Sequence, residues 1–113
     1  MLDINVVGHD RGVSLVEVHG RVDSTNADQM GEVLTGEIEH GRTQIVLDLS
    51  GVDYMSSAGL REIVSALKRA KREAGGDVRI AEPSYRVREV LELAGLDTIL
   101  QIYPSQVDAV GSY

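Results

Sequence analysis

The sequence of 113 residues contains no cysteine, no tryptophan and no phenylalanine, and its aromatic side chains are four tyrosines. The lack of cysteine excludes a disulfide framework, a thiolate nucleophile, an iron–sulfur cluster and any zinc site with cysteine ligands. It also suits a reducing compartment. With so few aromatic side chains, the core must be aliphatic, and stacking platforms for single-stranded nucleic acid are not expected.

Long hydrophobic runs and an excess of positive charge are missing as well. No apolar segment approaches the roughly 20 residues that span a bilayer, and residues 1–5 lack the basic and apolar regions of a signal peptide. The chain has 11 basic and 18 acidic residues, a formal net charge of −7, so nucleic-acid phosphates and anionic lipids repel it. We therefore expect a cytoplasmic protein that binds neither membranes nor nucleic acids.

What the sequence does have is a regular series of short apolar segments separated by turn residues. Alternation with a period of two predicts an N-terminal hairpin around a turn at 8–12, and its second strand is the more apolar and so the more central. Aliphatic runs predict further strands, and apolar residues at helical spacing predict helices between them. The predicted strands are 2–6, 13–19, 44–49, 78–81 and 98–103; the predicted helices are 25–39, 60–74, 84–94 and a turn or two after Pro104.

Glycines and small polar residues set the predicted boundaries. Gly20 marks the end of the second strand, and residues 50–53 form a turn. Asp23, Ser24 and Thr25 are candidate N-caps of the first helix. The order of elements predicts an α/β fold: a single domain over 1–113, with a mixed, mostly buried β-sheet and helices packed against it.

The sequence lacks the residue patterns of a metal site, a nucleotide-binding loop and a serine hydrolase. His9, His19 and His40 are scattered without a companion ligand at helical spacing, so no metal site is expected. The 12 glycines form neither a phosphate-binding loop nor a dinucleotide fingerprint, so no cofactor is expected. Ser57 lies at a strand-to-helix turn, as hydrolase nucleophiles do, but Gly-x-Ser-x-Gly is absent. We expect no enzyme; a small serine hydrolase or nucleotide-binding protein is the alternative from another class.

The segment 47–61, Leu-Asp-Leu-Ser-Gly-Val-Asp-Tyr-Met-Ser-Ser-Ala-Gly-Leu-Arg, resembles the core of the STAS domain family. Bacterial members of that family include the anti-sigma factor antagonists. Residues 20–23 are similar to the family's Gly-x-hydrophobic-Asp segment, and residues 83–96 are similar to its third helix. The resemblance therefore spans nearly the whole chain.

The resemblance implies a modification site. The family's strand-to-helix turn commonly reads Asp-Ser-Ser/Thr-Gly-Leu, and a partner kinase phosphorylates the serine after the aspartate. In this chain Ser56 stands at the aspartate position, Ser57 at the acceptor position and Ala58 at the second hydroxyl position. The acceptor is thus Ser57, with Ser56 the less favoured candidate. Taken without the resemblance, one of these two serines caps the following helix.

The resemblance also implies a function. An unphosphorylated antagonist binds an anti-sigma factor that is a serine-protein kinase, and this frees the sigma factor for transcription. The phosphorylated antagonist dissociates from the anti-sigma factor. A serine phosphatase then removes the phosphate. The ATP belongs to the partner. The expected partner-binding residues are Asp23, Ser24, Asn26, Tyr54, Ser56, Ser57, Ala58, Gly59 and Arg61. For the first three, capping of the first helix is an equal alternative.

Two other roles remain open for a STAS domain. One is a scaffold protein that binds non-kinase partners in a larger signalling assembly. The other is a subunit of a lipid or anion transport system with an ABC-type partner. Neither needs phosphorylation, so the identity of the bound partner separates them from an anti-sigma factor antagonist.

Overall fold

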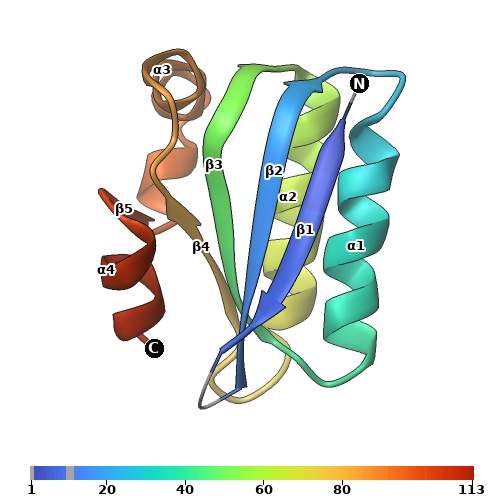
Figure 1. The fold of residues 1–113 in the computed structure, drawn as a ribbon, viewed down its shortest axis with the longest axis vertical. Coiled ribbons are helices and arrows are strands. Elements are labelled where there is room, and N and C mark those ends of the chain that lie inside the picture. Colours follow the sequence, from blue (N-terminus) through green and yellow to red (C-terminus); the bar gives the residue numbers. More distant parts are fainter. Residues whose placement is uncertain (1, 10–11) are drawn as a thin grey trace.

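A five-stranded mixed sheet forms the centre of the computed structural model, which describes residues 2–9 and 12–113 (Figure 1). The strand order is β1-β2-β3-β4-β5; β1 is antiparallel to β2 and the other neighbours are parallel. The strands are β1 (Asp3–Gly8), β2 (Val13–Val22), β3 (Gln44–Met55), β4 (Asp77–Ala81) and β5 (Ile102–Tyr103). The helices are α1 (Ala27–Glu39), α2 (Ser57–Ala70), α3 (Tyr85–Leu93), the 3-10 helix η2 (Leu96–Thr98) and α4 (Gln106–Gly111). The α/β class and the order of elements are as predicted.

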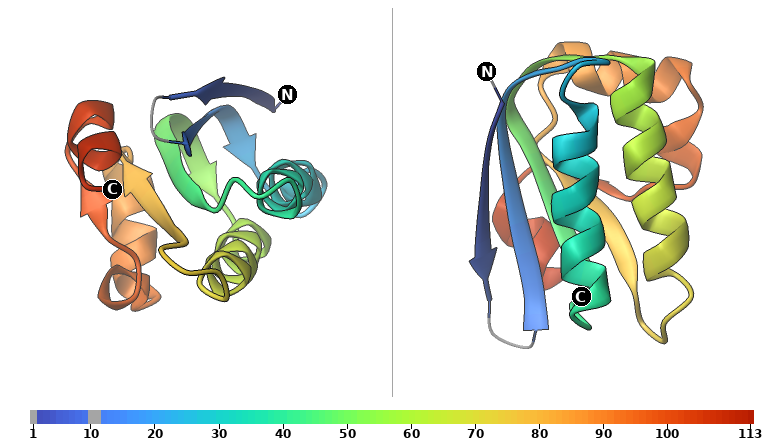
Figure 2. Two further views of the ribbon diagram at one scale, coloured as in Figure 1. Left: turned by 90° about the horizontal axis from the view of Figure 1, so that it is seen from below. Right: turned by 90° about the vertical axis from the view of Figure 1, so that its right-hand side faces the viewer.

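Different helices pack on the two faces of the sheet (Figure 2). Helices α1 and α2 lie side by side on one face, and α4 lies on the other. The α1–α2 side holds most of the core, which is aliphatic apart from two methionines. Its fully buried members include Val16, Val18, Leu34, Leu47, Leu49, Ile63 and Leu91. The strand segment Ile45–Leu49 is buried on both faces, as its continuous apolar run predicted.

Strands β2 and β3 are both longer than predicted. Residues 50–53 are not a turn but part of β3, and Gly20 does not end β2, which continues to Val22. The pairing shifts register between Glu17 and His19 and again between Gly20 and Arg21. At both shifts β3 has one residue more than β2, which is a bulge in β3, and Gly20 on the paired strand adopts a φ of 116° beside the second one. The prediction failed because a bulge and a turn use the same residues.

The first helix begins two residues later than predicted, at Ala27. Its N-cap is Asn26, and none of Asp23, Ser24 and Thr25 caps it. Instead, the Asp23 carboxylate accepts hydrogen bonds from the backbone N–H and the hydroxyl of Thr25. The local turn at Asp23 competes with helix capping for the same short polar side chains.

The last predicted strand is also shorter than expected. Of residues 98–103, only Ile102 and Tyr103 pair with β4. Gly95 adopts a left-handed φ of 74°, and the chain then turns through η2, which places Leu100 in the core. The third helix is as predicted, with the Ser84 hydroxyl accepting a hydrogen bond from Val87 N–H. Residues 10 and 11 of the predicted hairpin turn lie outside the described residues.

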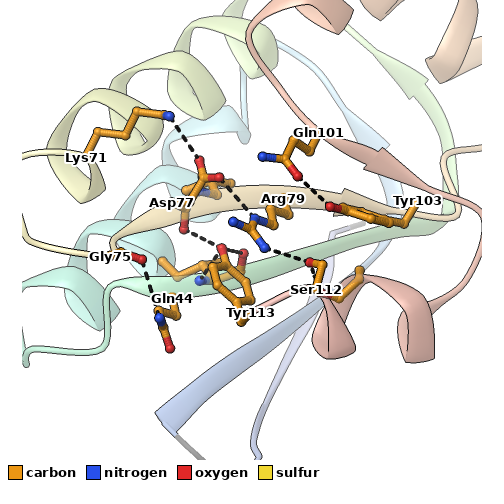
Figure 3. Close-up of polar contacts among 12 residues, drawn as sticks. Gln44, Lys71, Gly75, Asp77, Arg79, Gln101, Tyr103, Ser112 and Tyr113 are labelled. Atoms are coloured by element: carbon orange, nitrogen blue, oxygen red, sulfur yellow. Dashed lines mark hydrogen bonds and ion pairs between the residues drawn. The ribbon is translucent and has the colours of Figure 1, made fainter.

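Hydrogen bonds and a cation–π contact of the C-terminal residues hold α4 against the sheet (Figure 3). The Tyr113 hydroxyl lies 2.7 Å from the carbonyl oxygens of Ile45 and Asp77 and accepts a hydrogen bond from Ile45 N–H at 3.1 Å. The Arg79 guanidinium lies 4.0 Å from the centre of the Tyr113 ring and donates hydrogen bonds to Asp77 and Ser112. Burial raises the pKa of the Tyr113 hydroxyl above its usual range. The neutral hydroxyl therefore links β3, β4 and the C-terminal segment.

Candidate functional site

The turn from β3 into α2 is built around Ser56. Its backbone is extended, its N–H donates to the Val22 carbonyl at 2.9 Å, and its hydroxyl accepts a hydrogen bond from Gly59 N–H at 3.4 Å. Ser56 is thus the N-cap of α2, which confirms that one of the two serines caps this helix. Its side chain is half-buried and already engaged.

Ser57 is the first residue of α2 and is exposed. The capping hydrogen bond belongs to Ser56, so the Ser57 hydroxyl is left facing solvent at the rim of the domain. The first turn of α2 contains no acidic side chain. An anion at Ser57 would therefore meet the positive end of the helix dipole without a neighbouring carboxylate in that turn.

Gly59 allows the first turn of α2 to pack closely against the sheet. A Cβ at this position would lie 2.2 Å from the Met55 sulfur and 2.8 Å from a Val22 methyl carbon. Gly59, expected at the partner-binding surface, is instead buried, and Ala58 is half-buried against the core. Gly59 therefore lets the start of α2 approach β2 and β3 closely, which fixes where Ser57 projects.

The loop after β2 is held by its own polar side chains. Asn26 accepts a hydrogen bond from Asp23 N–H at 2.9 Å and donates one to the Arg21 carbonyl at 2.8 Å. The hydrogen bond from the Thr25 hydroxyl, followed by that from Thr25 N–H, holds the pKa of Asp23 below its usual range. Ser24 is exposed at the tip. The loop therefore presents an ionised carboxylate and an exposed hydroxyl in a fixed conformation.

Arg21 joins this loop to β3, and the sequence analysis missed it. Its guanidinium lies 3.9 Å from the centre of the Tyr54 ring on the paired strand, and its Nε lies 3.6 Å from the Asp23 carboxylate. Tyr54 is 40 % exposed. Only the β2–β3 register brings Arg21 opposite Tyr54, so linear spacing gave no signal for it. The structure thus brings Asp23 and Tyr54 together, as expected, through a residue that was not predicted.

On the other side of Ser57, α2 faces the segment after α3. Eight residues there line an open groove of about 530 Å³: Ser57, Leu60, Arg61, Val64, Ser65, Lys68, Ala94 and Leu96. Arg61, an expected site residue, is exposed at its rim. Lys68, Ala94 and Leu96 were not predicted. Lys68 follows Arg61 by seven residues on α2, whereas the approach of Ala94 and Leu96 to α2 depends on how α3 and η2 pack, which periodicity does not report.

The described residues contain no group of three or more histidine, aspartate or glutamate side chains placed to hold a metal ion. His19 instead packs on Gly51, where a Cβ would lie 2.1 Å from the imidazole Nδ1. Within the same part of the chain, no helix has the length and apolar character to cross a membrane.

Comparison with known proteins decides the family. The model of the STAS domain matches residues 4–109. The chain belongs to the STAS domain family. This confirms the resemblance found in segment 47–61, which the structure places across the end of β3 and the start of α2.

Relatives of this STAS domain carry consistent names. BtrV of Bordetella bronchiseptica, whose provisional name is anti-sigma factor antagonist, is 33 % identical over 102 residues, which cover 90 % of this chain and 87 % of BtrV. An anti-sigma-B factor antagonist of Staphylococcus aureus is 31 % identical over 87 residues, 77 % of this chain and 80 % of that protein. The crystal structure of an anti-sigma factor antagonist from Mycobacterium paratuberculosis has 25 % identity and a TM-score of 0.88, covering 99 % of this STAS domain and 93 % of that chain.

Proposed function

We propose that this STAS domain is an anti-sigma factor antagonist whose binding to its anti-sigma factor is switched off by phosphorylation of Ser57. The names of its relatives support the first part. The exposed hydroxyl of Ser57 at the first position of α2 supports the second, and it is the observation that carries the switch.

Ser57 is a better acceptor than Ser56. The Ser56 hydroxyl is half-buried and caps α2, so a kinase would have to break the cap to reach it. The Ser57 hydroxyl needs no such rearrangement. The chain has Ser56 where the family commonly has aspartate, so the acceptor lacks a negative charge on its N-terminal side.

A phosphate on Ser57 acts on the partner and not on the fold. It adds about −1.5 to −2 charges, which the helix dipole and the unpaired N–H groups at the start of α2 favour. Inside a protein interface, the same dianion repels nearby carboxylates and must be desolvated. A penalty of about 3 kcal/mol weakens binding more than a hundredfold, which is enough for an on/off signal.

The partner supplies the chemistry in this scheme. It is a cytoplasmic anti-sigma factor with serine-kinase activity and bound ATP, and a serine phosphatase restores the free hydroxyl. This chain is the substrate and not an enzyme. Its binding surface consists of the start of α2 with the neighbouring β2–α1 loop and Tyr54, and it includes Asp23, Ser24, Asn26, Tyr54, Ser56, Ser57, Ala58 and Arg61.

Phosphorylation is tested by incubating the chain with each anti-sigma factor kinase of its source organism and ATP. Intact mass should rise by one phosphate, and peptide mapping should place it on Ser57. The matched variants are Ser57→Ala, which should take up no phosphate, and Ser56→Ala, which should still be modified. Phosphate on Ser56 alone, or on neither serine with every kinase tried, would overturn the assignment.

A further inference from the structure

The groove between α2 and the segment after α3, called here the α2–α3 groove, has an apolar floor and a charged rim. Leu60 and Val64 of α2 and Ala94 and Leu96 of the facing segment supply the apolar part. Two cations, Arg61 and Lys68, lie along α2. They are seven residues apart, two helical turns, so both stand on the same side of the helix about 10 Å from each other.

The charge of the groove is opposite to that of the molecule. The chain carries a net charge of −7, yet no carboxylate is among the residues that line the groove in the described structure. The third cation of α2, Arg69, pairs with Glu39 at 3.9 Å. In the same described ranges, Arg61 and Lys68 form no ion pair. The groove thus offers two uncompensated cations beside exposed apolar surface.

We propose that the α2–α3 groove docks an acidic segment of the anti-sigma factor, whose apolar side chains cover Leu60 and Val64 while its carboxylates pair with Arg61 and Lys68. Charge complementarity selects this occupant, because a basic or uncharged segment would leave both cations without partners. The inference rests on the proposed function and adds the chemistry of the docked segment to it.

The same groove explains how a phosphate on Ser57 reaches the partner. Ser57 and Arg61 are four residues apart on α2 and both line the groove, so a phosphate on Ser57 stands within reach of the Arg61 guanidinium. The phosphate then takes the cation that a partner carboxylate would use. It also places a dianion at the end of the groove that an acidic segment must approach.

Binding measurements test the docking surface. The dissociation constant of the anti-sigma factor is measured by calorimetry at two salt concentrations for the wild type, Arg61→Gln, Lys68→Gln and the double variant. Each single change should weaken binding about tenfold and reduce its salt dependence. The matched control is Arg86→Gln, which removes an exposed arginine of α3 outside the groove and should leave affinity within about twofold.

The link to the phosphate has a readout that needs no partner. The chain is prepared with phosphoserine at 57, and the phosphate is titrated by ³¹P NMR. Its second pKa, ordinarily about 6, should be lowered in the wild type and should rise in Arg61→Gln. Lys68→Gln, two turns further along, should change it less. Equal phosphate pKa values in the wild type and Arg61→Gln would contradict the pairing.

The binding measurements distinguish a failure of the proposed function from a failure of the groove inference. If the unphosphorylated wild type binds no anti-sigma factor, the proposed function fails. If it binds, but Arg61→Gln and Lys68→Gln bind as tightly as the wild type, the groove inference alone fails. If these variants instead change the oligomeric state in sedimentation, a second copy of the chain occupies the groove and the acidic-segment inference is wrong.

Discussion

The Arg21 guanidinium stacks on the Tyr54 ring at 3.9 Å, across the paired strands β2 and β3. The same guanidinium reaches the Asp23 carboxylate at 3.6 Å. One side chain therefore orders two residues of the expected binding surface, Tyr54 from β3 and Asp23 from the loop after β2. A partner that contacts this surface meets Tyr54 and Asp23 in one conformation and loses less entropy on binding.

Loss of this stacking should weaken partner binding with little effect on the fold. Arg21→Ala removes an exposed cation–π contact, worth about 0.5–1 kcal/mol, so the anti-sigma factor should bind up to about fivefold more weakly. Thermal unfolding should shift little, because Arg21 is exposed. Calorimetry and a melting curve on the same preparations make the comparison, with Arg86→Ala as control. Unchanged affinity would show that the ordering of Tyr54 is irrelevant to the interface.

The two serines should separate stability from switching. Ser56→Ala removes the N-cap of α2 and should lower the free energy of unfolding by about 1 kcal/mol. Ser57→Ala removes an exposed hydroxyl, so unfolding should change by less than about 0.5 kcal/mol. Urea denaturation of the two variants measures both values. The reverse order of effects would mean that Ser57 is the structural residue.

Gly59→Ala should destabilise the domain by about 1–3 kcal/mol, because the new Cβ would collide with the Met55 sulfur at 2.2 Å and with Val22 at 2.8 Å. Gly36→Ala is the matched control. Gly36 lies within α1, and no heavy atom outside the neighbouring helix backbone lies within 4 Å of an added Cβ, so alanine should stabilise there by about 0.5–1 kcal/mol. Relative to the wild type, the urea midpoint should fall for Gly59→Ala and rise for Gly36→Ala. A neutral Gly59→Ala would refute the tight approach of α2 to the sheet.

Stability should fall in acid partly through Glu37. The Arg42 side chain, which donates hydrogen bonds at 2.8 and 2.9 Å, and the Ser14 hydroxyl lower the pKa of Glu37 from its ordinary 4.5. A folded-state pKa below the unfolded one stabilises the fold fully above about pH 4.5, and this contribution is lost as the pH falls through the lowered value. Glu37→Gln should therefore be less stable than the wild type at pH 7.

The difference between the wild type and Glu37→Gln should shrink at pH 3, where protonation also removes the charge from Glu37. Urea midpoints at both pH values measure it. Glu39→Gln changes an exposed carboxylate of the same helix and should show a smaller difference at pH 7. A Glu37→Gln deficit that persists unchanged in acid would rule out ionisation of Glu37 as its cause.

The sequence predicted those parts of the fold that depend on local pattern. The apolar run Ile45–Leu49 predicted a buried strand, and the apolar spacing from Leu60 predicted a helix over 60–74, which the structure places at Ser57–Ala70. Ser57 was expected at a strand-to-helix turn, and it lies at one because β3 continues to Met55 and α2 begins at Ser57. The family resemblance in segment 47–61 supplied the functional expectation.

Features that depend on pairing and packing could not be predicted. The bulges at Gly20 and beside Gly51 exist because two distant strands meet, and either glycine alone is equally typical of a turn. Likewise, Arg21 meets Tyr54 only through the strand register, and Leu96 lines the groove beside α2 only through the position of η2. The central site residue was therefore accessible from the sequence, while its surroundings required the structure.

The most direct test of the switch compares the affinity for the anti-sigma factor between the unmodified and the phosphorylated chain. The dissociation constant of the anti-sigma factor is measured for the unmodified chain and for the same chain carrying phosphoserine at 57, after circular dichroism shows that both are equally folded. The account predicts binding that is weaker by more than about a hundredfold in the phosphorylated form. Equal affinities for two equally folded forms would contradict it.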